Sequence, residues 1–179
     1  MQDKYWAELS KQSDWLKFAW HKRQGDPAIV DNTETEIESF HRVHSLINAK
    51  NPDLWTKTIR LHSWEISKEV LDFMRKTGAV ETLLTADRPK RSYDLTGIEQ
   101  DILKKKGRFE KNNIKYLETK IRFDWLEEGI GLEKLYEITR NFMKEESSEK
   151  LIVFCHEWAF DRIKNKIERY WESLLKDNY

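Results

Sequence analysis

The stretch LIVFCH, residues 151–156, is the most apolar segment of the chain and ends in a histidine. A short apolar run of this length predicts a buried β-strand. A long segment with helical periodicity follows at residues 160–175. A strand that leads into a helix is the repeating unit of parallel α/β folds, and the rest of the chain shows the same unit.

Short apolar runs and amphipathic segments alternate all the way to the N-terminus. Further strands are predicted at residues 15–20, 55–61, 80–86 and 115–125, and further helices at residues 2–12, 33–49, 67–76, 96–106 and 132–144. This order predicts an α/β fold of alternating helices and parallel strands, either an open doubly wound sheet or a (β/α) barrel. Because the first element is a helix, a first strand is expected to be missing or altered. No linker rich in Pro, Gly or Ser divides the chain, so residues 1–179 are expected to form a single domain.

Local signals mark several of the predicted boundaries. Thr96 and Glu99 have the spacing of a capping box at the start of a helix. Gly78 and Gly107 stand where helices are expected to end. Residues 115–125 alternate clearly, which predicts one strand with an apolar face and a second face that carries Glu118, Lys120, Arg122 and Asp124.

Charge and hydropathy exclude several classes of protein. Basic and acidic residues both number 32, so no net charge favours binding to nucleic acid or to an anionic membrane. No apolar run approaches the roughly 20 residues of a transmembrane helix. The N-terminus lacks the pattern of a signal peptide, so a cytoplasmic location is expected. The one cysteine, Cys155, excludes an internal disulfide.

Chemically active side chains stand where the predicted strands end. Ligands of parallel α/β folds bind at the carboxyl ends of the strands, where the loops converge. Imidazole and carboxylate groups together bind Zn²⁺ or a similar divalent ion, or act as general acid and base. Each histidine alone is also consistent with a hydrogen-bonded core or loop residue, but the set predicts a functional site. Its members are His21, His62, Asp87, Asp124 and His156.

Other candidate motifs fail on geometry or spacing. His156 and Glu157 begin like a zinc-protease HExxH motif, but position 160 is Phe. Cys155 and His156 are neighbours on a strand, so their side chains point to opposite faces and form no dyad. His41 and His44 are spaced to share a metal on a helix, although a helix-surface or helix-core role is favoured.

Four segments around these strand ends resemble, in order, a bacterial branch of the polysaccharide deacetylases, the NodB-homology proteins of carbohydrate esterase family 4. The segments are DWLKFAWH (14–21), IRLHSW (59–64), LLTAD (83–87) and VFCHEW (153–158). The resemblance implies an incomplete or distorted (β/α) barrel. It also implies removal of N- or O-acetyl groups from a carbohydrate, with the help of a divalent ion (Zn, Mn, Co or Ni).

The resemblance assigns roles to individual residues. His21 matches the first metal-binding histidine, and His62 is a candidate second ligand. Arg60 matches the arginine that orients the catalytic base, and Asp87 matches the aspartate of the following motif. His156 matches the general acid of the last motif. Asp124 and a set of tryptophans would contact the carbohydrate: Trp20, Trp64, Trp125 and Trp158.

The chain departs from the family pattern at two places. No strand with paired aspartates precedes the opening helix, and Gly25 occupies the position of the second metal histidine. Two hypotheses therefore follow. Either the chain is a metal-dependent hydrolase acting on acetylated carbohydrate, or it is a catalytically degenerate carbohydrate-binding or interaction domain on the same scaffold.

Overall fold

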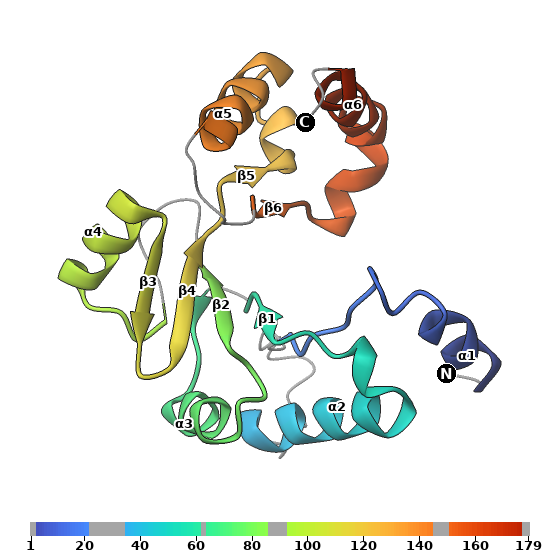
Figure 1. Ribbon diagram of the computed structural model, residues 1–179, viewed down its shortest axis with the longest axis vertical. Helices are drawn as coiled ribbons and strands as arrows, with labels where there is room; N and C mark the ends of the chain where they lie inside the picture. Colours follow the sequence, from blue (N-terminus) through green and yellow to red (C-terminus); the bar gives the residue numbers. More distant parts are fainter. Residues whose placement is uncertain (1–2, 22–34, 62–63, 86–92, 145–150, 177–179) are drawn as a thin grey trace, which may run out of the picture. The chain divides into compact units, whose positions relative to one another are not determined.

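The computed structural model describes residues 3–21, 35–61, 64–85, 93–144 and 151–176. They form a mixed α/β structure in which most of the paired strands are parallel (Figure 1). The chain divides into two compact units, Met1–Leu117 and Glu118–Tyr179. Each unit has its own apolar core. That residues 1–179 act as one domain stays a prediction.

The first unit is built on a four-stranded sheet with the order β1-β2-β4-β3. The strands are β1 (Thr58–Ile59), β2 (Thr82–Thr85), β3 (Arg108–Lys111) and β4 (Ile114–Glu118). β1 and β2 are parallel, whereas β3 and β4 form an antiparallel hairpin. The hairpin turn consists of Asn112 and Asn113, both with positive φ, which is the backbone that a two-residue hairpin loop requires.

The helices of this unit begin and end where short-range chemistry dictates. They are α1 (Asp3–Ser10), α2 (Glu36–Lys50), the 3₁₀ turn η1 (Pro52–Leu54), α3 (Lys68–Thr77) and α4 (Gly97–Lys106). The predicted capping box of Thr96 and Glu99 is confirmed. Gly78 and Gly107 both adopt the left-handed conformation that ends a helix. Apolar side chains from these helices and strands fill one core that includes Phe40, Leu61 and Leu83.

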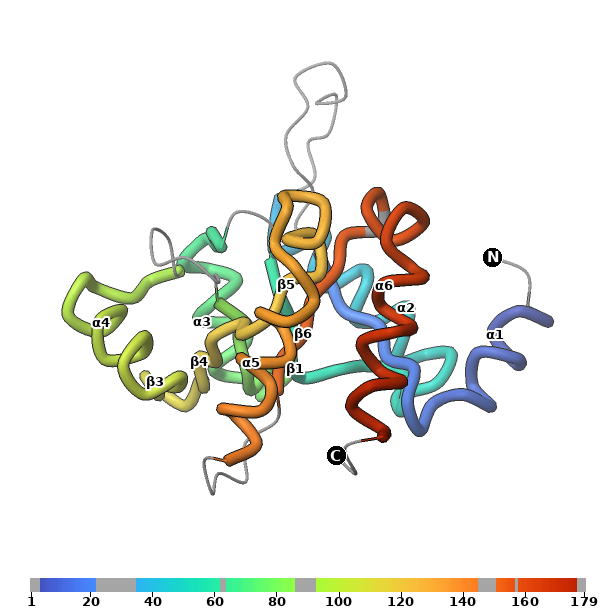
Figure 2. The backbone as a smooth tube through the Cα atoms, turned by 90° about the horizontal axis from the view of Figure 1, so that it is seen from above, coloured from blue at the N-terminus to red at the C-terminus, as the bar shows by residue number. Residues whose placement is uncertain are grey.

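The second unit combines two short strands with two helices. Its elements are β5 (Ile121–Arg122), the 3₁₀ turn η3 (Phe123–Leu126), α5 (Leu132–Lys144), β6 (Val153–Phe154) and α6 (Glu157–Lys176). β5 and β6 are parallel. Figure 2 shows α5 (orange) and α6 (red) running side by side, and the ring of Tyr136 in α5 stacks on that of Tyr170 in α6. Leu135, Ile163 and Tyr170 close the core between the helices.

Three sequence-based expectations about the strands are wrong. Residues 15–20 are not a strand; only Phe18 makes an isolated bridge, to Trp55. Residues 115–125 are not one strand, because the chain leaves β4 after Glu118, pairs again as β5 and then turns into η3. The sheet is not wholly parallel, since β3, which the sequence analysis did not predict, pairs antiparallel with β4. In the described part of the chain, no helix is long and apolar enough to cross a membrane.

Candidate functional site

Asp124 and His156 lie opposite each other at the carboxyl ends of β5 and β6. The parallel register pairs Arg122 with Phe154, so continuing it by two residues brings Asp124 opposite His156. Asp124 has just entered η3, and the carbonyl of His156 accepts the first hydrogen bonds of α6. The structure thus brings together two of the residues that the sequence analysis placed at strand ends, and their role as a functional site stays a prediction.

The carboxylate of Asp124 binds His156 twice. Oδ1 accepts the backbone N–H of His156 at 3.0 Å, and Oδ2 lies 2.5 Å from Nδ1 of its imidazole. A carboxylate only accepts hydrogen bonds, so Nδ1 carries the proton and Nε2 is the nitrogen left for other chemistry. The side chain of Asp124 is 1% exposed, and that of His156 is 29% exposed. The carboxylate of Asp124 is therefore buried, whereas the ring of His156 is partly exposed to solvent.

Arg122 supplies the compensating charge that a buried carboxylate needs. Its Nε lies 3.8 Å from Oδ2 of Asp124, and its other end pairs with Glu128. Asp124 was expected on the face of a strand shared with Glu118, Lys120 and Arg122. The 3₁₀ turn rotates it out of that pattern and into the protein interior.

Aromatic rings surround the imidazole of His156. The ring of Phe154 meets it edge-on at 4.5 Å between centroids. The indole of Trp158 stacks on it at 5.3 Å, with 24° between the planes. Trp158 is 54% exposed and carries the guanidinium of Arg162 at 5.4 Å from its ring centroid. Arg162 in turn pairs with Glu127. An exposed indole beside a polar pair suits the apolar face of a sugar ring.

Trp125 differs from Trp158. It follows Asp124 in η3 and packs against the core of the second unit. Its indole N–H is buried and finds no hydrogen-bond acceptor among the residues that the structure describes. An unmet buried donor is uncommon in folded proteins. The indole N–H therefore has capacity for an acceptor oxygen from a ligand or a water molecule.

Two predicted site residues of the first unit, Trp20 and His21, are neighbours with opposite exposure. Trp20 is 2% exposed and belongs to the core, where its indole N–H donates to the hydroxyl of Ser39 at 3.2 Å. Its ring meets Phe40 edge-on. His21 is exposed. Trp20 thus has the surroundings of a packing residue.

Arg60 and Trp64 form a second pair in the first unit. The guanidinium of Arg60 lies 5.1 Å from the ring centroid of Trp64, within the range of a cation–π contact. Trp64 has a φ of 53°, and its buried indole N–H has no acceptor within the described ranges. His62 and Asp87, the other predicted residues of this unit, lie outside the described residues.

No group of three potential metal ligands gathers in the described part of the chain. His62 and Asp87 do not belong to that part, so the predicted metal site stays a prediction. His41 and His44 take part in aromatic packing. The ring centroid of His41 lies 4.1 Å from that of Phe73, and the ring centroid of His44 lies 4.7 Å from that of Trp55. Burial, with a smaller effect from His41, lowers the pKa of His44.

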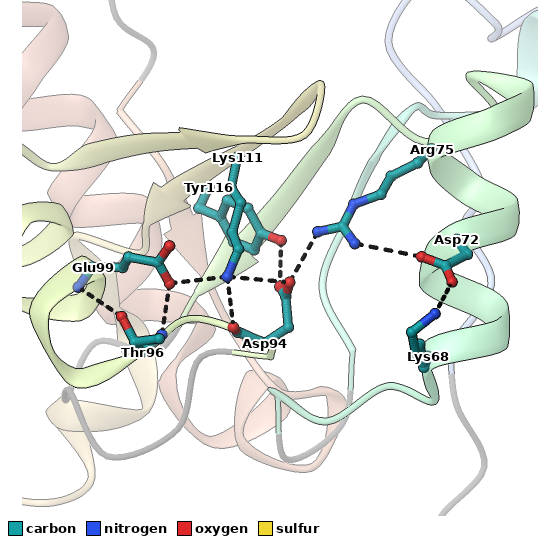
Figure 3. Close-up of polar contacts among 8 residues, drawn as sticks. All are labelled: Lys68, Asp72, Arg75, Asp94, Thr96, Glu99, Lys111 and Tyr116. Atoms are coloured by element: carbon teal, nitrogen blue, oxygen red, sulfur yellow. Dashed lines mark hydrogen bonds and ion pairs between the residues drawn. The ribbon is translucent and has the colours of Figure 1, made fainter.

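A polar cluster around Asp94 joins several elements of the first unit (Figure 3). Its carboxylate accepts hydrogen bonds from the Tyr116 hydroxyl at 2.6 Å and from Arg75 at 2.9 Å. Lys111 binds the backbone carbonyl of Asp94 and the carboxylate of Glu99, both at 3.0 Å. Most donors and acceptors of the cluster satisfy one another, so we interpret it as a structural junction; the buried Nε of Arg75 has no partner among the described residues.

Sequence reasoning missed one role in the Asp124–His156 pair. The sequence predicts Asp124 as a substrate contact, whereas in the structure its carboxylate binds His156. Both residues follow short apolar strands, and that shared position was the available signal. Comparison with family models, with curated proteins and with solved structures found no match to this chain.

Proposed function

We propose that this protein is a hydrolase that removes acetyl groups from a carbohydrate, with His156 as its general acid. The observation that supports the proposal is the Asp124–His156 pair, whose imidazole stacks on the half-exposed Trp158. The resemblance of residues 153–158 to the last deacetylase motif points to the same histidine. A histidine held by a buried carboxylate is a common arrangement for proton transfer.

In this proposal Asp124 orients the imidazole and His156 moves the proton. The hydrogen bond at Nδ1 holds the ring, so Nε2 faces the reacting group. As general acid His156 acts in its doubly protonated form, with Nδ1–H on Asp124 and a second proton on Nε2. When the tetrahedral adduct of water and the acetyl carbonyl collapses, the bond from the acetyl carbon to the sugar nitrogen or oxygen breaks, Nε2–H protonates that departing atom, and acetate leaves. The proton that the attacking water loses passes to solvent, and solvent returns a proton to Nε2. The exposed part of the Trp158 indole, which His156 and Arg162 leave uncovered, contacts the sugar and sets its distance from Nε2.

The rest of the proposed site comes from the resemblance. His21 and His62 would hold a divalent ion that polarises the acetyl carbonyl, and Arg60 and Asp87 would act beside it. A distorted (β/α) barrel is the arrangement of strands that the resemblance implies, and it belongs to this proposal.

A second candidate function is carbohydrate binding without catalysis. The observation that favours it is the exposure of Trp158, 54%, next to the ion pair of Arg162 and Glu127. An exposed indole flanked by hydrogen-bonding groups binds sugars without any reaction. The two candidates differ only in whether acetate is released.

Acetate release and metal content test the proposal together. Protein purified without chelator is assayed for Zn, Mn, Co and Ni, and for acetate release from an N-acetylglucosamine tetramer and an O-acetylated xylo-oligosaccharide. We expect His156→Ala to lower kcat by about 10²–10⁴-fold, the usual contribution of a general acid, and to keep the metal. His41→Gln, on an exposed helix position, is the matched control and should keep its activity.

The outcomes separate the two candidates. Wild-type protein that releases no acetate from either substrate and holds no stoichiometric metal would contradict the hydrolase. Binding of the same oligosaccharides in calorimetry, lost in Trp158→Ala, would then support the binding domain. Equal activity of wild type and His156→Ala would remove His156 from the mechanism.

A further inference from the structure

The parallel pairing of β1 and β2 ends one hydrogen bond earlier than its register would allow. Thr58 pairs with Thr82 and Ile59 with Leu83. In a parallel ladder with this register, the N–H of Leu61 would next donate to the carbonyl of Leu84. That bond is replaced by a side chain from outside the two strands.

The hydroxyl of Tyr93 lies between these two backbone groups. It accepts the N–H of Leu61 at 3.2 Å and donates to the carbonyl of Leu84 at 2.8 Å. Burial raises the pKa of Tyr93 well above its usual range, although the N–H of Leu61 and the charge of Arg60 oppose the rise. The hydroxyl therefore keeps its proton and remains a donor. One oxygen atom therefore bridges the ends of the two strands.

The backbone of Tyr93 holds the turn that follows β1. Its N–H donates to the carbonyl of Trp64 at 2.8 Å, and the N–H of Trp64 donates to the carbonyl of Leu61 at 3.2 Å. Tyr93 and Trp64 both have positive φ, 56° and 53°. Left-handed backbone is costly for aromatic residues and persists where surrounding contacts enforce it, often near functional sites.

Arg60 depends on the same contacts. It stands between Ile59, the last residue of β1, and Leu61, whose N–H Tyr93 binds. Its guanidinium rests against Trp64, whose carbonyl Tyr93 also binds. Tyr93 thus constrains the backbone on both sides of the Arg60–Trp64 contact, from more than 25 residues further along the chain.

We propose that Tyr93 is a positioning residue that acts through Arg60 and Trp64, by lying between the ends of β1 and β2 and by binding the backbone of Leu61 and of Trp64. The catalytic relevance of this positioning rests on the proposed function, in which Arg60 belongs to the site. The positioning of Arg60 and Trp64 by Tyr93 does not depend on the proposed function. In Tyr93→Phe the N–H of Leu61 and the carbonyl of Leu84 lose their shared partner, and direct pairing between them moves Arg60 and Trp64.

Nuclear magnetic resonance tests the positioning without any activity. In ¹⁵N-labelled protein the indole signal of Trp64 is assigned by its loss in Trp64→Phe. We expect Tyr93→Phe to shift or broaden that signal and to speed amide exchange at Leu61, while most other indole signals stay in place. The matched control is Tyr116→Phe, which removes another hydroxyl of the first unit, one that binds Asp94 and not the turn. An unchanged Trp64 signal in Tyr93→Phe, or the same change in Tyr116→Phe, would overturn the proposal.

Kinetics on the acetylated oligosaccharides tests the connection to Arg60. We expect Tyr93→Phe to lower kcat by about tenfold with little change in KM, as for an interaction that counts in the transition state. In an Arg60→Ala background the same substitution should cost less than about twofold, because the residue it positions is gone. Equal losses in both backgrounds would exclude action through Arg60. A wild type that releases no acetate contradicts the proposed function, while the indole signal still decides the positioning.

Discussion

At the scale of single residues, Asp124 combines features that rarely occur together on a surface acid. It is 1% exposed, it receives a backbone N–H and an imidazole from the same residue, and it has a guanidinium 3.8 Å away. Burying a carboxylate is costly unless hydrogen bonds and a counter-charge replace the lost water. These three contacts replace the lost water. They fix the orientation of the Asp124 side chain, which in turn fixes the orientation of the His156 ring.

Asp124→Asn tests this role directly. The amide nitrogen of Asn donates instead of accepting, so facing Nδ1 it favours the tautomer with the proton on Nε2. Imidazole ¹⁵N shifts of His156 should report that change of tautomer. If His156 is the general acid, kcat should fall by about 10²–10⁴-fold, because the doubly protonated ring loses the carboxylate that orients it and stabilises its positive charge. Asp161→Asn, on an exposed position of α6, is the control. A His156 tautomer that does not change would contradict the assigned hydrogen bond.

At the scale of elements, the stretch from residue 108 to residue 126 shows how turns divide an alternating pattern. The two-residue loop of Asn112 and Asn113 reverses the chain and pairs β3 with β4. Past β4 the chain pairs with a different strand, β6. Alternation of period two continues through β4 and β5, and this is why one strand is predicted over residues 115–125. No strand is predicted at β3, although the Asn112–Asn113 pair is a signal of a two-residue hairpin loop.

Substitutions at Asn113 test the hairpin. Its φ of 64° is the left-handed region, which glycine adopts freely and a β-branched residue resists. We expect Asn113→Gly to raise the free energy of unfolding by about 0.5 kcal/mol, and Asn113→Val to lower it by about 1–2 kcal/mol. Urea unfolding followed by circular dichroism measures both. A higher free energy of unfolding for Asn113→Val than for Asn113→Gly would mean that the turn has another conformation.

At the scale of the whole molecule, the cluster around Asp94 connects elements that are distant in sequence. Asp94 precedes α4, Arg75 belongs to α3, and Lys111 and Tyr116 come from the two strands of the hairpin. Burial raises the pKa of Asp94. The hydrogen bonds from Tyr116 and Arg75, with the charges of Arg75 and Lys111, outweigh it and lower that pKa below its ordinary value. The folded first unit therefore favours the ionised carboxylate.

The pH dependence of stability follows from this direction. A carboxyl group whose pKa is lower in the folded state stabilises the protein above its unfolded pKa, here 3.8. That contribution is lost as the pH falls through the lower folded value. Asp94→Asn should lower the free energy of unfolding at pH 7 by about 1–3 kcal/mol and flatten its decline in acid. Urea titrations between about pH 2 and 7 measure this. Asp101→Asn, exposed on α4, should retain the wild-type decline.

The sequence by itself determined the elements whose ends depend on local chemistry. The helices α3 and α4 were predicted within a residue or two, because Thr96, Gly78 and Gly107 satisfy or terminate helical backbone within one turn. Only the tertiary structure decided which strands pair and which way they run. It also decided that Asp124 turns inward to His156 and that Tyr93 reaches Leu61 and Leu84. Those contacts join residues far apart in the chain, and their energy depends on burial and register, which periodicity within a single segment does not encode.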